Sequence, residues 1–339
     1  MTPKISIIMP MYGVEAYIGQ SIKSVQNQTF TEWELLIVND GTKDGSREIA
    51  AAYVQNDSRI RIIDKENGGL TSARLRGLRE ARGNYISFVD SDDTLDPDYL
   101  EVLYTNIREY DADISMCSYN VVQNGVVYGQ KLYFQNQTTV IQGASIFSNY
   151  ILPQISSVKK GVSFLPSFMW LRLIKKDILS ENLFVSERVV YQEDLVFSLR
   201  ISNRLGKVVV VNLPLYNYFV NNGSLTQRYR SNAWEMMQVL TAEIKQVLYA
   251  FPKANTKERL YSRTLCAVHF ILMNAAYLDF RSFKKEFSRV LAEQSVRDAC
   301  KRFSLMRTKR CYWVLLISLW LHSPYVIYNY NKKRLLGWI

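Results

Sequence analysis

Residues 85–93 read Tyr-Ile-Ser-Phe-Val-Asp-Ser-Asp-Asp, and this stretch decides the kind of fold to expect. Its first five residues predict a buried strand. Three carboxylates follow within four positions, those of Asp90, Asp92 and Asp93. Mg²⁺ and Mn²⁺ prefer such oxygen ligands and commonly join one or two carboxylates to substrate phosphates. The same residues also suit an acidic turn before a helix that begins near Pro97, so both interpretations stay open here.

The hundred residues around this stretch alternate between strand and helix patterns. Such alternation predicts a parallel sheet with right-handed crossovers, in which ligands bind beyond the carboxyl ends of the strands. Two acidic turns, at Asp40 and at Asp90, follow strands at that edge. We expect strands at 5–9, 33–38, 60–63 and 85–89, and helices at 15–28, 46–55 and 72–81.

The rest of the chain changes character twice. Residues 97–211 are mixed, with a hairpin expected around 120–129, and the sequence beyond Arg230 is mostly helical. We therefore predict an α/β fold with a mostly parallel sheet flanked by helices, followed by a mainly helical C-terminal region. The expected domains are residues 1–225 and 226–339.

Length and composition exclude several classes of protein. The chain has 339 residues, 48% of them hydrophobic and 22% charged, which suits about two globular domains. The four cysteines form no CxxC pair and there are two histidines, so a zinc site of Cys and His is not expected. No GxGxxG or GxxxxGK[ST] motif is present, which excludes the usual dinucleotide fold and the P-loop. The N-terminus has no signal-peptide pattern, and we expect a cytoplasmic protein.

The net charge of +11 is concentrated in the C-terminal third. Residues 225–339 contain 20 Lys and Arg against 7 Asp and Glu. An eleven-residue stretch with one polar residue, Cys311–Leu321, is too short to span a membrane, which takes about 20 residues. Its tryptophans and the flanking basic residues are typical of a membrane-interface segment, at about 309–339, on an anionic surface. A helix that docks on the protein's own core is the alternative. Nucleic acid is not expected as a partner, because no binding motif accompanies the charge.

Three further motifs precede the acidic stretch of residues 88–93. They are Pro-Met-Tyr-Gly-Val-Glu at 10–15, Val-Asn-Asp-Gly-Thr-Lys-Asp-Gly-Ser at 38–46 and Asn-Gly-Gly-Leu-Thr-Ser-Ala-Arg at 67–74. Together, in this order and spacing, they resemble the inverting family 2 glycosyltransferases of the GT-A fold, closely over about residues 4–100 and more weakly to about 228. The sequence departs from the family pattern at Gly13, Asn39, Thr42 and Leu75.

The resemblance implies a nucleotide-sugar site. The Pro10–Tyr12 backbone and Glu15 would border the base, and Asp40 would accept a hydrogen bond from uracil. Arg74 would orient the carboxylates and the nucleotide. The remaining implied residues are Asp90 and Ser91 at the nucleotide, and Asp92 as the ligand of a divalent metal, Mn²⁺ or Mg²⁺.

Two motifs in the second half resemble the acceptor side of these enzymes. Glu193 and Asp194 match the E-D motif, whose Asp deprotonates the acceptor, although an acidic helix start is the alternative. Trp170 and Arg172 lie in a segment similar to W-N-K-L, which would border the acceptor, although a core Trp is equally plausible. Residues 213–230 also resemble this class. One of their arginines could close over the diphosphate, although a solvated basic turn is the favoured alternative.

The expected function is a metal-dependent, inverting transfer of a sugar from a nucleotide donor, a UDP-sugar, to a hydroxyl of a saccharide acceptor. The basic, aromatic tail points to a lipid-linked acceptor in cell-surface polysaccharide synthesis, with the enzyme peripheral at the inner face of the cell membrane. Two alternatives are a catalytically inactive nucleotide-sugar-binding partner subunit and a nucleotidyltransferase.

Overall fold

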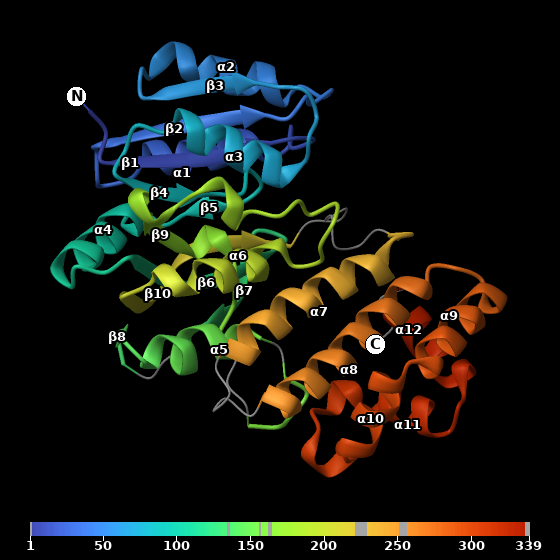
Figure 1. The fold of residues 1–339 in the computed structure, drawn as a ribbon. Coiled ribbons are helices and arrows are strands. Elements are labelled where there is room, and N and C mark those ends of the chain that lie inside the picture. Colours follow the sequence, from blue (N-terminus) through green and yellow to red (C-terminus); the bar gives the residue numbers. More distant parts are fainter. Residues whose placement is uncertain are drawn as a thin grey trace. The chain divides into compact units, whose positions relative to one another are not determined.

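The computed structural model describes residues 2–133, 136–155, 157–161, 165–220, 229–250 and 256–335. The chain forms two compact units (Figure 1). Unit 1 comprises Met1–Ile151, Pro166–Arg188 and Gln192–Asn222, and unit 2 comprises Leu152–Leu165, Val189–Tyr191 and Gly223–Ile339. The boundary expected near residue 225 and the motif at 223–228 lie outside the described residues.

The first half of unit 1 is a parallel sheet, as predicted. Its strands lie in the order β3-β2-β1-β4 (Figure 1). Every residue of β1 and β2 is buried, which is why these strands are nearly continuous apolar runs. The strands are β1 (Ile5–Met11), β2 (Trp33–Asn39), β3 (Ile60–Asp64) and β4 (Tyr85–Phe88).

Three helices cover this parallel sheet. Helices α1 (Ile18–Gln26) and α2 (Ser46–Asn56) contact each other, and α3 (Leu70–Glu80) packs on β1 and β2. Met9 accepts a hydrogen bond from Ser21 of α1, whereas its neighbour Ile8 faces Gly77 of α3. Because adjacent strand residues point to opposite faces, α1 and α3 cover opposite faces of the sheet.

The second half of the sheet corrects the prediction of a mostly parallel sheet, because the whole sheet is mixed. Strand β9 runs antiparallel between β4 and β6, and β10 pairs parallel with β6. Strands β6 and β7 form the expected hairpin, whose turn places Asn124 and Gly125 at positive φ. Such short turns join only antiparallel strands. The strands are β5 (Thr94–Leu95), β6 (Ile114–Gln123), β7 (Val126–Lys131), β8 (Thr138–Gln142), β9 (Arg172–Lys175) and β10 (Lys207–Phe219).

Two helices and one short 3₁₀ turn complete the part of unit 1 that matters for the site. Helix α4 (Tyr99–Glu109) packs on β6 and β10. Helix α6 (Glu193–Ile201) begins with the two acidic residues of the E-D motif. The turn η2 (Met169–Leu171) leads directly into β9.

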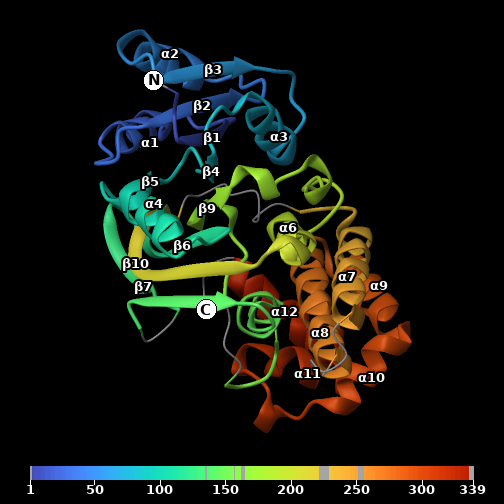
Figure 2. The same cartoon turned by 60° about the vertical axis from the view of Figure 1, so that its left-hand side comes forward.

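Unit 2 is helical in its described residues, as predicted for the C-terminal region. Both views show α7 and α8 side by side (Figures 1 and 2). The helices are α5 (Leu152–Gln154), α7 (Ala233–Ala250), α8 (Thr256–Ala275), α9 (Phe280–Ala292), α10 (Gln294–Arg302), α11 (Trp313–Trp320) and α12 (Pro324–Leu335).

The apolar stretch expected at a membrane forms α11, and most of it packs inside unit 2. Leu315, Leu316 and Leu319 of α11 are buried, as is Ile327 of α12. This burial favours the docking-helix alternative for that face of the segment. No helix in the described ranges is both long and apolar enough to span a bilayer. Residues 336–339 of the expected segment lie outside the described residues.

Candidate functional site

The loops that follow β1 and β2 hold each other by hydrogen bonds. The backbone N–H groups of residues 13–15 donate, in order, to Thr42, Ser46 and Asp44 at 2.9, 3.1 and 3.0 Å. Burial raises the pKa of the Asp44 carboxyl, but bonds from the Ser46 and Thr42 hydroxyls and from two backbone amides outweigh it, so the pKa falls to about 2. Asp44 therefore stabilises the loop that carries the first motif.

The first-motif residues differ in exposure. Pro10 is buried within β1, in register with Val38 of β2. Tyr12 is 55% exposed, which leaves its ring available to a ligand. Glu15 accepts a hydrogen bond from the backbone N–H of Gly45 at 3.0 Å. These residues border one side of the carboxyl edge of the sheet.

Both carboxylate oxygens of Asp40, which follows β2, already accept hydrogen bonds from other residues of the chain. Its side chain is buried and accepts hydrogen bonds from the backbone N–H groups of Gly68 and Gly69 at 2.9 and 2.8 Å. The Lys65 ammonium also pairs with it. Gly69 has a φ of 92°, a conformation that favours glycine. Asp40 thus holds the turn that leads into α3.

The turn after β4 carries the acidic stretch. Asp93 is buried and accepts hydrogen bonds from the Tyr216 hydroxyl at 2.9 Å and the Phe219 backbone N–H at 2.8 Å. Ser91 is also buried, whereas Asp92 is partly exposed. Asp93 therefore has a structural role here, and Asp92 and Asp90 are the carboxylates of this turn that solvent reaches.

Arg74 joins the two halves of the predicted site. This α3 side chain is 1% exposed. Its guanidinium nitrogens lie 2.8 Å from Asp194, 3.3 Å from Asp90 and 3.7 Å from Glu193. Burial lowers the pKa of Arg74, but the three carboxylates outweigh it and raise the pKa above its ordinary value. A permanently charged guanidinium thus links the end of β4 to the start of α6.

Two of these carboxyl groups have an unusual proton affinity. Burial raises the pKa of Asp90 to about 6, with a further rise from Asp92, although Arg74 acts to lower it. Burial and the adjacent Asp194 raise the pKa of Glu193 to about 7. Shifts of this kind mark candidate functional sites, since structural carboxylates are more often driven the other way.

Asp194 is oriented by two donors. One of its oxygens accepts from Arg74, and the other accepts from the Met169 backbone N–H at 3.2 Å. A carboxylate can accept further hydrogen bonds beyond these two. Its orientation is therefore set before any hydroxyl arrives.

Trp170 and Arg172, expected beside the acceptor, are both buried, with exposures of 4% and 0%. Arg172 donates to the Ser198 hydroxyl at 2.8 Å and lies over the Tyr150 ring. Trp170 stacks on Tyr216 with ring centroids 4.2 Å apart. Side chains with so little exposed surface favour the alternative of a core position, and a direct contact with the acceptor stays a prediction.

Glu187 is a site residue that the sequence motifs missed. It accepts hydrogen bonds from the backbone N–H groups of Leu70 and Thr71 at 3.1 and 3.0 Å, and so caps the N-terminus of α3 from 116 residues away in the chain. Nearby, Arg188 donates to Asn67 at 2.6 Å. Glu187 belongs to no motif and lies outside regular structure, so only a tertiary contact could have identified it.

The donor set at the end of β4 suits a hard divalent cation. In the part of the chain that the structure describes, no three metal-binding side chains converge on one point. Asp92 and Asp90 nonetheless offer only oxygen ligands, and Asp90 has few compensating donors for its charge. Mg²⁺ usually takes one or two carboxylates, with substrate phosphates and water completing its shell. The residues present therefore fit a metal that arrives with a diphosphate.

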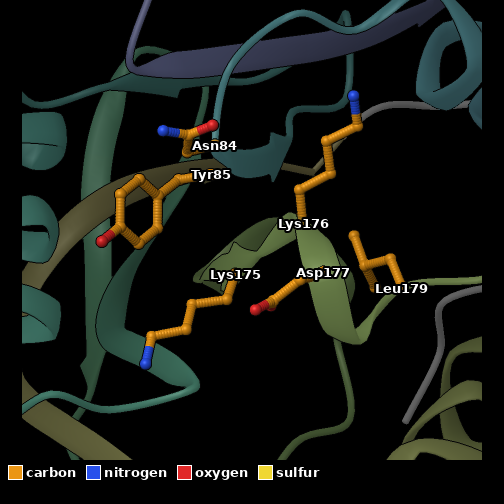
Figure 3. A pocket seen from close by; sticks show the side chains of 6 residues that line it. All are labelled: Asn84, Tyr85, Lys175, Lys176, Asp177 and Leu179. Carbon is orange, nitrogen blue, oxygen red and sulfur yellow. The ribbon is translucent and has the colours of Figure 1, made fainter.

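A pocket lies elsewhere in unit 1. It has a volume of about 550 Å³ and is lined at the N-terminal end of β4 and the C-terminal end of β9 (Figure 3). The ammonium of Lys175 pairs with Asp111 at 2.8 Å, and that of Lys176 donates to the Ala81 carbonyl at 2.6 Å. Both cations are thus engaged within the chain, and the pocket is at the opposite end of β4 from Asp90.

A comparison with known families identifies the chain. The family described as Glycosyl transferase family 2 matches residues 6–173, which contain all four motifs of the N-terminal half. Residues 6–173 of the chain belong to glycosyl transferase family 2. The resemblance expected from the sequence is confirmed, and the chain is placed among the glycosyltransferases.

Named relatives carry the same assignment. Glycosyltransferase GlyA of Streptococcus pneumoniae is 35% identical over 226 residues, which are 66% of this chain and 32% of GlyA. EpsH of Bacillus subtilis, also named a glycosyltransferase, is 29% identical over 300 residues, 86% of this chain and 81% of EpsH. The family 2 chain thus spans about a third of GlyA and most of EpsH.

Solved structures share the fold. The structure of S. aureus TarS 1-349 in complex with UDP-GlcNAc has a TM-score of 0.68 at 19% identity and covers 98% of this chain and 92% of that one. The mannosyltransferase PcManGT from Pyrobaculum calidifontis, in complex with GDP-Man and Mn²⁺, has a TM-score of 0.53 at 13% identity, with coverage of 100% and 88%. The GT-A-like α/β fold expected for this family 2 chain is therefore confirmed.

Proposed function

We propose that the chain is an inverting glycosyltransferase that moves a sugar from a UDP-linked donor to a hydroxyl of a saccharide. The observation that carries the proposal is the buried Arg74, which lies 3.3 Å from Asp90 and 2.8 Å from Asp194. This contact supports the proposal because it holds the proposed donor-side and acceptor-side carboxylates close to the same guanidinium. UDP is the proposed nucleotide because the TarS structure of the same fold contains UDP-GlcNAc.

In the proposed reaction Asp194 is the base. It takes the proton of the acceptor hydroxyl as that oxygen forms a bond to the anomeric carbon of the donor. The bond between this carbon and the diphosphate oxygen breaks, its electron pair leaves with UDP, and a single displacement inverts the configuration. Arg74 and the Met169 N–H orient the Asp194 carboxylate, so that the reactants meet in line.

Asp92, with Asp90 beside it, is the proposed holder of a divalent metal. A bound Mn²⁺ or Mg²⁺ would neutralise charge on the departing diphosphate. Tyr12, Glu15 and Ser91 are proposed to border the nucleotide together with the Pro10 backbone. Asp40 is proposed to act at the base mainly through the Gly68–Gly69 turn that it holds.

The proposed setting is the cytoplasmic face of the cell membrane, with a lipid-linked saccharide as acceptor in polysaccharide synthesis. Trp320, Leu321, Tyr325 and Val326 are large apolar residues at the α11–α12 junction that are 42–69% exposed. The cationic C-terminal third supplies attraction to anionic lipid, about 1 kcal/mol per basic residue near the surface. We therefore propose residues 320–326 as the lipid contact, in place of the whole segment 309–339.

The membrane proposal is tested by point substitution, since truncation would remove buried leucines. Leu321→Glu with Tyr325→Glu should weaken sedimentation with phosphatidylglycerol vesicles about tenfold, because apolar transfer is lost and negative charge is added. Tyr128→Glu, at a position 80% exposed on β7, is the matched control. Equal binding of the two variants would contradict the proposed contact.

The proposed transfer is tested by screening nucleotide sugars for release of the nucleotide, with and without Mn²⁺, and by analysing the products. UDP as product supports a glycosyltransferase. Pyrophosphate would indicate the nucleotidyltransferase alternative, and binding without release would indicate the inactive partner subunit.

A further inference from the structure

Five aromatic side chains gather where η2, β6 and β10 meet in unit 1. We call them the aromatic cluster: Tyr119, Phe168, Trp170, Tyr216 and Tyr218. The Phe168 and Trp170 rings are stacked with centroids 4.8 Å apart, and Trp170 is also stacked on Tyr216 at 4.2 Å and on Tyr218 at 5.8 Å. Tyr119 meets Trp170 edge-on at 5.1 Å.

One side of the cluster is buried and the other side is partly exposed to solvent. Trp170 and Tyr216 are 4% and 0% exposed, so they form the support. Phe168, Tyr119 and Tyr218 keep part of their surface in solvent. Rings that pack on one another in this way are rigid, because each has little rotamer freedom left.

The cluster extends from the proposed base to the acidic turn. Phe168 directly precedes Met169, whose N–H donates to Asp194. At the other end, the Tyr216 hydroxyl donates to Asp93. The backbone N–H of Phe219, directly after Tyr218, also donates to Asp93 at 2.8 Å.

A pyranose ring combines two kinds of surface that this arrangement matches. Its hydroxyls lie around the rim and suit carboxylates, whereas its axial C–H groups form flat apolar patches that bury well against an aromatic ring. A linear polyol has no such flat patch. Phe168 directly precedes the residue whose N–H binds Asp194, so the part of an acceptor next to its attacking hydroxyl would lie near Phe168.

On the basis of the proposed function, we propose that the aromatic cluster is the acceptor subsite and that it stacks on a pyranose ring bearing the attacking hydroxyl. Trp170 then acts through Phe168 and Tyr218, as a support and not as a contact. The acceptor class is a ring saccharide, in preference to a polyol chain.

The first experiment measures binding to the full chain with UDP present. Methyl glycosides of common hexoses and N-acetylhexosamines are compared with ribitol by saturation-transfer NMR. We expect transfer to the axial C–H protons of at least one glycoside, and none to ribitol. Equal responses, or none from any glycoside, would overturn the inference, whether or not the chain turns over a donor.

The second experiment uses variants of Phe168. Phe168→Leu keeps the apolar volume but removes the ring, and should weaken glycoside binding about tenfold, whereas Phe168→Tyr should bind as wild type does. The dissociation constant of UDP should stay within about twofold in both. Tyr128→Leu is the control for an exposed aromatic residue far along β7.

Failure of this inference and failure of the proposed function give different results. Nucleotide release from a donor, with glycoside affinity unchanged in Phe168→Leu, overturns the subsite alone. Absence of release from every nucleotide sugar, with ring-dependent glycoside binding intact, overturns the transferase and retains the subsite. A parallel loss of UDP and glycoside binding in Phe168→Leu would show that the ring has only a structural role.

Discussion

The turns after β2 and β4 are both acidic and both follow strands that pair with β1, yet they use their carboxylates differently. Asp40 accepts hydrogen bonds from the Gly68 and Gly69 amides and pairs with Lys65, and is 3% exposed. Among the described residues, Asp90 pairs with Arg74 at 3.3 Å, and burial and Asp92 raise its pKa to about 6.

The difference lies in the donors that the chain itself supplies. Backbone amides and an ammonium already donate hydrogen bonds to the Asp40 carboxylate. Such a carboxylate stabilises its loop, and binding a ligand would add little favourable interaction energy. A carboxylate that has fewer donors and lies beside another acid is stabilised when a cation or a hydroxyl binds to it. We therefore expect the Asp40 turn to act in stability and the Asp90 turn to act in function, so that substitutions in the two turns separate activity from stability.

The largest effect is expected for Asp92→Asn in the turn after β4. Turnover should be abolished and the dependence of UDP binding on Mn²⁺ lost, because an amide is a weaker, uncharged metal ligand. The free energy of unfolding should change by less than about 1 kcal/mol, since the side chain is only partly buried. Titration of UDP with and without Mn²⁺ tests this, with the exposed Asp98→Asn as control. Unchanged metal dependence would remove Asp92 from the site.

Asp194→Asn should lower turnover by about 10²–10⁴-fold while UDP binding persists, because only the proton acceptor is removed. Single-turnover transfer and UDP affinity are the two measurements. Glu193→Gln is the matched variant one residue earlier. A deeper loss in Glu193→Gln, with Asp194→Asn near wild type, would assign the base to Glu193, whose pKa is already raised to about 7.

Asp40→Asn should mainly lower the free energy of unfolding. Removing the charge leaves Lys65 without its partner in a site where the two side chains are 5% and 17% exposed, which costs about 3 kcal/mol. Urea unfolding measures the loss. Asp64→Asn, at the end of β3, breaks the exposed pair with Arg47 and should cost less than about 1 kcal/mol. Similar losses in the two variants would mean that the Asp40 turn is not structural.

The smallest effect concerns the pH dependence of stability through Asp44. Its pKa is about 2 in the folded chain against 3.8 ordinarily, so its contribution is fully present above pH 4 and is lost as the pH falls towards 2. The contribution amounts to about 2 kcal/mol. Asp44→Asn should remove that part of the acid dependence, as measured by urea unfolding at pH 2.5 and pH 6. Parallel curves for the two proteins would contradict the assignment.

Much of the N-terminal half could be predicted because its strands are buried on both faces. Runs such as Ile5–Met9, in which Ser6 is the one polar residue, are nearly continuous and apolar for that reason, and acidic turns follow β2 and β4. Strand β9 escaped prediction because Arg172–Lys175 has four residues of mixed character, and its place between β4 and β6 depends on tertiary pairing.

The sequence named candidate site residues but could not predict the contacts between them. The motifs named Arg74, Asp90 and Asp194, but the contact between Arg74 and Asp194 joins residues 120 apart, which no spacing rule relates. The same limit hid Glu187 at α3. For Trp170 and Arg172 the sequence left a core position and an acceptor contact both open, because a motif does not show burial. Their packing on Tyr216 and Ser198 favours the core position.

The link between Arg74 and Asp194 has a consequence for how the chain is assembled. The parallel strands are synthesised well before residue 194, and until then the guanidinium has Asp90 alone as a close carboxylate partner. Burying a cation short of its partners is unfavourable, so we expect α3 to settle on the nascent sheet only after α6 has been made. A ribosome-bound chain stalled before Glu193 should accordingly leave α3 open to protease, and one stalled well beyond it should not.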